Sequence, residues 1–87
     1  MNTFRVWLQL SDYGCVVQVE GIDNAHWLLD QLGRSFVFRS AEPIVERQNT
    51  PVCTFRVAYG PLTSIHQLQR LLAAMPEVVL ARVATVS

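Results

Sequence analysis

The chain has 87 residues, of which 51% are hydrophobic and 16% are charged. The length fits a single domain, residues 1–87, and the composition excludes a disordered tail or linker. Seven arginines balance seven acidic residues, and this net charge of zero gives no long-range attraction for nucleic acid or an anionic membrane. A core this small is marginal alone, so a second chain that buried more apolar surface would stabilise it.

The N-terminal residues show neither a basic segment nor an apolar run of the kind that a secretion signal needs. No apolar stretch approaches the ~18 residues of a membrane span, so we expect a cytoplasmic protein that does not enter a membrane. Cys15 and Cys53 lack the spacing of metal ligands and fall on inward strand positions. We therefore expect them to be buried free thiols rather than a disulfide.

The first half of the chain predicts a β-hairpin followed by a helix. Residues 3–10 and 15–20 alternate between apolar and polar, and residues 11–14 have the composition of a turn. Asp23 and Asn24 are good helix N-caps, and Gly33 offers a C-terminal stop. Apolar residues recur between them at helical spacing: Ala25, Leu28, Leu29 and Leu32.

The second half of the chain predicts further strands, a second helix and a last strand. Residues 35–40 read as a strand, Pro43 breaks it, and residues 44–48 continue it as an edge. Residues 52–59 form the clearest strand, and a capping box at Ser64 begins a helix that Pro76 ends. The apolar, β-branched run at residues 78–86 predicts a last strand.

The predicted order is therefore β-β-α-β-β-α-β. The two middle units match at an offset of 40 positions, with His26 on His66 and Leu28 on Leu68. We expect an α+β two-layer sandwich: an antiparallel or mixed sheet with two helices on one face, built as a ferredoxin-like βαββαβ core plus an N-terminal strand. That strand cannot pair with its hairpin neighbour without displacing the last strand, which must then move within the sheet or pair with a second chain.

Two tryptophans are the main candidates for binding a partner. Trp27 lies almost opposite the apolar stripe of its helix, so it is either an exposed interface anchor or is covered by a loop. Trp7 falls on the sheet face away from the helices, and four arginines share that face: Arg5, Arg39, Arg56 and Arg82. Three interpretations of this face are open: it stacks nucleic-acid bases, which the zero net charge disfavours, it seats a partner chain, or it is solvated and crossed by pairs with Glu20 and Glu46.

A weaker candidate is the turn that precedes the first helix, where Gly21, Asp23 and Asn24 offer backbone amides to an anion or amino acid. A simple helix cap is the alternative interpretation. His26 and His66 lack ligand partners at metal spacing, so we expect no metal and no cofactor. Known nucleophile, phosphate-binding and metalloprotease motifs are absent, and Ser64 does not face His66 properly, so the sequence favours a protein that is not an enzyme.

The sequence does not determine the function. Its best prediction is a small cytoplasmic, non-enzymatic interaction module, most simply a homodimer that associates through the open sheet face or a strand edge, with Trp7, Trp27, Arg5 and Arg56 as contact residues. The first alternative is a domain that senses a small molecule at residues 21–24. The second alternative is a small enzyme that uses His26, His66 or Asp30 as its acid and base.

Overall fold

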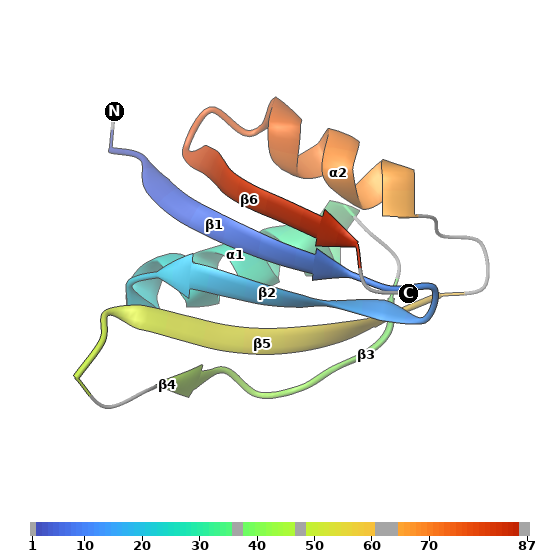
Figure 1. The fold of residues 1–87 in the computed structure, drawn as a ribbon, viewed down its shortest axis with the longest axis horizontal. Helices are drawn as coiled ribbons and strands as arrows, with labels where there is room; N and C mark the ends of the chain where they lie inside the picture. Colours follow the sequence, from blue (N-terminus) through green and yellow to red (C-terminus); the bar gives the residue numbers. More distant parts are fainter. Residues whose placement is uncertain (1, 36–37, 47–48, 61–64, 86–87) are drawn as a thin grey trace.

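The protein folds as an α+β sandwich with one mixed sheet and two helices in a computed structural model that describes residues 2–35, 38–46, 49–60 and 65–85 (Figure 1). Its elements follow the predicted order: β1 Phe4–Leu10, β2 Gly14–Glu20, α1 Ile22–Ser35, β3 Phe38–Ala41, β4 Val45–Glu46, β5 Val52–Tyr59, α2 Ile65–Ala74 and β6 Val78–Thr85. The capping box proposed at Ser64 lies outside the described residues.

The predicted hairpin is confirmed. β1 and β2 pair antiparallel from Val6 opposite Val19 to Leu10 opposite Cys15. Ser11 closes the turn, because its backbone N–H and its hydroxyl both donate to the Gly14 carbonyl, at 2.9 Å each. A strand joined by so short a turn pairs with its neighbour in sequence.

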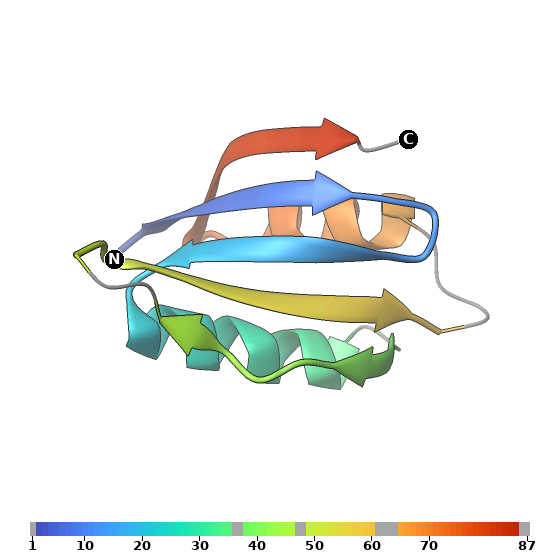
Figure 2. The same cartoon turned by 60° about the horizontal axis from the view of Figure 1, so that its bottom comes forward.

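The hairpin decides the order of the sheet, which is β3-β5-β2-β1-β6, with β4 also paired to β5 (Figure 2). β1 occupies the place beside β2, so β6 lies one position further out and pairs parallel with β1. The ferredoxin-like strand order is therefore not confirmed. Of the two outcomes expected for the displaced strand, the structure shows a move within the sheet.

The predicted end of the first helix is wrong. α1 continues past Gly33 to Ser35, because Gly33 keeps a helical backbone and does not act as a stop. Ser35, predicted to begin a strand, is the last residue of α1. The described parts of the strands predicted for residues 35–40 and 44–48 contain β3 and β4, while residues 36–37 and 47–48 lie outside the described residues.

The core lies between the sheet and the helices: α1 lies behind the sheet in the view of Figure 1, and α2 lies behind β1 and β2 in the view of Figure 2. Alternate residues of β1 are fully buried there, from Phe4 to Leu10, as their period of two predicts. β2 and β5 contribute Cys15, Val17, Val19, Cys53, Phe55 and Val57, and the helices add Ala25, Leu28, Leu32, Leu68 and Leu72. Neither described helix is long and apolar enough to cross a membrane.

Candidate interaction surface

The side chains that alternate with the core residues form the other face of the sheet, which no described helix covers (Figure 2). We call this surface the open face; β1, β2 and β5 contribute Arg5, Trp7, Gln9, Val16, Gln18, Glu20, Thr54, Arg56 and Ala58 to it. Arg82 joins it from β6, where it is the register partner of Trp7. The prediction that Arg5, Trp7, Arg56 and Arg82 share a face is confirmed, while the side chain of Arg39 is outside the described part.

Trp7 is the only aromatic ring that β1, β2 and β5 place on the open face, and it is partly buried there. The guanidinium carbon of Arg5 lies 5.5 Å from the centroid of its ring. At that distance the cation is attracted to the electron-rich face of the indole. The contact covers part of the ring and leaves the rest available.

Arg5 is itself held by Glu20 on the neighbouring strand. Its Nη2 donates to Glu20 Oε2 at 2.7 Å and its Nε donates to the same oxygen at 3.2 Å. The hydrogen bond from Arg5 lowers the pKa of the Glu20 carboxyl from its usual 4.5. The expected cross-strand pair therefore forms, and it holds the Arg5 guanidinium beside Trp7 while the Arg5 side chain stays 59% exposed.

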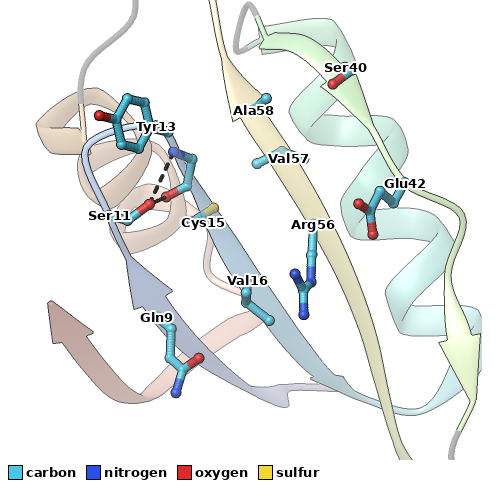
Figure 3. A pocket seen from close by; sticks show the side chains of 11 residues that line it. Gln9, Ser11, Tyr13, Cys15, Val16, Ser40, Glu42, Arg56, Val57 and Ala58 are labelled. Carbon is cyan, nitrogen blue, oxygen red and sulfur yellow. Dashed lines mark hydrogen bonds between the residues drawn. The ribbon is translucent and has the colours of Figure 1, made fainter. Parts of the chain in front are cut away.

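Arg56 differs from Arg5 because no ion-pair partner is found for it among the described residues. It stands exposed on β5 beside a hollow of about 450 Å³ at the hairpin end of the open face (Figure 3). Gln9 and Val16 line the sheet side of this hollow, and Glu42 lies across from Arg56 on the segment after β3. The hollow thus holds a cation and an anion that do not neutralise each other directly.

A second hollow of about 270 Å³ lies next to Trp7, lined by Gln18, Thr50 and Val52. The open face is therefore not flat: Trp7 and Arg56 each border a depression. Depressions of this kind suit a partner that inserts side chains into them, because shape complementarity brings apolar atoms into contact.

Trp27 is covered in part by the end of a strand, which a helical wheel does not take into account. It is partly buried, and the ring of Phe4 meets it edge to face with centroids 5.9 Å apart. The N-terminal end of β1 covers the indole on the helical side of the sheet, away from the open face. Of the two interpretations left open for Trp27, the structure favours the covered one, although the residue that covers it is Phe4 of β1 and not a loop. A contact of Trp27 with a partner stays a prediction.

The turn before α1 has a structural use for two of its polar groups. The N–H of Gly21 donates to the Pro51 carbonyl at 2.8 Å, and the side-chain amide of Asn24 donates to the Glu20 carbonyl at 2.7 Å. Gly21 adopts a φ of 92°, a conformation that favours glycine. α1 begins at Ile22, so Asp23 and Asn24 lie in its first turn and the prediction that they are N-caps is wrong. Gly21 directly precedes the helix, and its carbonyl accepts the Ala25 N–H at 3.0 Å.

The histidines and cysteines are the remaining candidates for metal binding or catalysis. His26 and His66 are both exposed on their helices, and no group of three or more potential metal ligands occurs within the described ranges. Cys15 and Cys53 are buried free thiols. Burial raises the pKa of Cys15 to about 12 and also raises that of Cys53, so neither is an activated nucleophile.

Sequence reasoning missed three residues of this surface. Tyr13, at the tip of the hairpin, is 87% exposed and borders the larger hollow, while Glu42 lies across from Arg56. Val45 is 60% exposed on β4 opposite Thr54. An aromatic residue in a polar turn was a usable signal for Tyr13, whereas the place of Glu42 depends on how β3 docks against β5.

Comparison with protein families, with curated proteins and with solved structures found no match for this chain.

Proposed function

We propose that this protein is a small non-enzymatic interaction module that forms a homodimer through its open face. Trp7 carries the proposal: a tryptophan on an uncovered sheet face, held by a fixed arginine and flanked by a hollow. Tryptophan and arginine are the side chains most enriched at the centres of protein interfaces. A side chain already fixed in the free chain also loses less entropy when a partner binds.

The charges of the open face favour a protein over nucleic acid as the partner. Glu20 neutralises Arg5, and the chain as a whole has no net charge. A phosphate backbone would require several uncompensated cations on one surface. Two copies related by a two-fold axis could instead place Arg56 of one chain near Glu42 of the other.

The experiment is the solution mass at several concentrations, measured by sedimentation equilibrium for the wild type and for Trp7→Ala. We expect a wild-type dimer and a Trp7→Ala variant that dissociates at a concentration at least about tenfold higher. Trp27→Leu is the matched control, because it also removes an indole but on the helical side. A monomeric wild type at millimolar concentration, or a Trp7→Ala dimer as stable as the wild type, contradicts the proposal.

Binding of a small molecule is the second candidate function, and the larger hollow favours it. Arg56 and Glu42 present opposite charges in one depression of about 450 Å³, which suits a zwitterion such as a free amino acid. Thermal shifts against amino acids test this candidate, and Arg56→Gln should abolish them. Asp23→Asn tests the other location, the turn at Gly21 to Asn24, and loss of the shift in that variant alone places the ligand there.

As part of the same proposal we assign the protein to the cytoplasm and its fold to a modified ferredoxin-like unit. Two buried free thiols are typical of a reducing compartment. The proposal for the fold is supported by the order of the strands other than β1, which is β3-β5-β2-β6, although β2 and β6 are not neighbours in the sheet. β1 is then a strand inserted between two members of a βαββαβ core.

A further inference from the structure

The two edges of the sheet are protected to very different degrees. One edge consists of β3 and β4, which are four and two residues long. Pro43 separates them, and Glu42 and Glu46 add charge. Short strands, proline and charge are the devices by which proteins prevent an edge from pairing with another chain.

The other edge is β6, which is eight residues long and carries a single charge, Arg82. Among the described residues, no strand pairs with its outer side. In a parallel pair, alternate residues of a strand direct their N–H and C=O groups toward the neighbour, and the others direct them away. β6 therefore presents a row of backbone groups that an extended chain would satisfy.

The side chains of β6 also favour contact with a second strand. Val79 and Val83 are 45% and 43% exposed, so two valines of this strand stay in water. The pairing with β1 slips by one residue between Leu80 and Arg82, which makes Ala81 a bulge. Beyond the bulge, Arg82 to Thr85 is regular and follows β1 to its end.

We propose that the outer edge of β6 pairs antiparallel with β6 of a second copy of this chain, so that one continuous sheet runs through both copies. A two-fold axis perpendicular to the sheet keeps the helices of both copies on the same side. The protected β3–β4 edge leaves β6 no complementary edge on another copy, so the contact closes as a dimer instead of growing as a fibre.

The faces of β6 decide the register. Val83 is paired with the buried Leu8 and so lies on the helical side, whereas Arg82 lies on the open face with Trp7. Antiparallel partners share a face, so an axis at Arg82 would oppose two positive charges. An axis at Val83 instead sets the two Val83 side chains against each other and pairs Arg82 with Ala84.

This edge dimer is independent of the open-face contact and uses different residues. An edge axis is perpendicular to the sheet, whereas the axis of a face-to-face contact lies parallel to it, so both contacts together give a closed tetramer where the two axes intersect. Either contact would form a dimer if the other contact were absent.

The test uses Val83→Lys, with Ala41→Lys as the matched control: Ala41 is exposed on β3 of the protected edge and, as the register partner of Val57, lies on the helical side of the sheet as Val83 does. Sedimentation equilibrium should show that Val83→Lys halves the wild-type mass or raises the dissociation constant about tenfold or more, because two lysines oppose each other at the axis. Ala41→Lys should leave the mass unchanged. Far-ultraviolet circular dichroism checks that both variants fold.

A second measurement needs no variant. Residue-level hydrogen exchange on the wild type should show that alternate amides of residues 81–85 become protected as the protein concentration rises through the dissociation constant. The proposal is wrong if those amides stay unprotected in the associated protein, if Val83→Lys keeps the wild-type mass, or if the mass grows without limit. If Trp7→Ala loses the dimer and Val83→Lys keeps it, the edge contact is rejected and the open-face contact is supported. If Val83→Lys loses the dimer and Trp7→Ala keeps it, the open-face contact is rejected and the edge contact is supported.

Discussion

The guanidinium of Arg5 lies over the indole of Trp7, two positions along the same strand and on the same side of the sheet. Glu20 holds that guanidinium from the next strand at 2.7 Å. The carboxylate, the cation and the ring therefore form one short chain of contacts on a face that nothing described covers. Its effect is to fix the orientation of a large aromatic side chain in the free protein, which favours association.

The titration of Glu20 reports this chain of contacts directly. Because the hydrogen bond from Arg5 favours the charged carboxylate, a carbon-13 NMR titration should give Glu20 a pKa below 4.5. The stabilisation is present above the unfolded value and is lost as pH falls through the folded value. Arg5→Met should return the pKa of Glu20 toward 4.5. Arg56→Met is the control and should leave the pKa of Glu20 as low as in the wild type. An unshifted Glu20 in the wild type would exclude the ion pair in solution.

Phe4 and Trp27 should be coupled in stability. Their edge-to-face contact predicts that Phe4→Leu and Trp27→Leu each lower the free energy of unfolding, and that the double variant loses less than the sum. We expect an interaction energy of about 0.5–1.5 kcal/mol from urea unfolding of the four proteins. Strict additivity would show that the rings do not interact.

The period of each strand was enough to predict which residues of β1, β2 and β5 face the helices, because a strand alternates whatever it pairs with. It therefore predicted the open face and the place of Trp7 on it. The partner of Trp27 was not predictable, since its contact with Phe4 depends on where β1 ends relative to α1. The place of β6 depended on whether hairpin pairing or a βαββαβ order prevailed, and the short turn at Ser11 to Gly14 decided for the hairpin.

Stability should fall at alkaline pH. Burial raises the pKa of Cys15 to about 12 and that of Tyr59 to about 12, so the folded state holds protons that the unfolded chain releases near its ordinary values of 9.0 and 10.0. The stabilisation is complete below those values and declines as pH rises toward the folded ones. Urea unfolding at pH 8 and at pH 11 measures how far the free energy of unfolding declines between the two pH values. Cys15→Ala should make that decline smaller. An equal free energy of unfolding at both values would contradict the assignment.

Gly14 and Gly33 should respond in opposite directions to the same substitution. A Cβ on Gly14 would meet the backbone carbonyl of Val57 on β5, and backbone in a paired strand cannot move aside. Gly14→Ala should therefore destabilise the protein by about 2 kcal/mol or more, with lost pairing between β2 and β5. Gly33 lies inside α1 with a helical backbone, and its nearest neighbour, the Phe38 ring, is an ordinary contact at 3.8 Å. Gly33→Ala should stabilise the protein by about 0.5–1 kcal/mol, because alanine loses less backbone entropy in a helix.

Thermal unfolding of the two variants beside the wild type measures both effects, and hydrogen exchange in β2 locates the first. The opposite signs matter because Gly33 was predicted to end the helix. A destabilising Gly33→Ala would mean that the residue adopts a left-handed conformation in solution and that α1 ends there. A tolerated Gly14→Ala would mean that β2 and β5 are further apart at the hairpin end than in this structure. Because Arg56 borders the larger hollow at that end, the homodimer and the small-molecule site, which both use Arg56, would then need a different geometry.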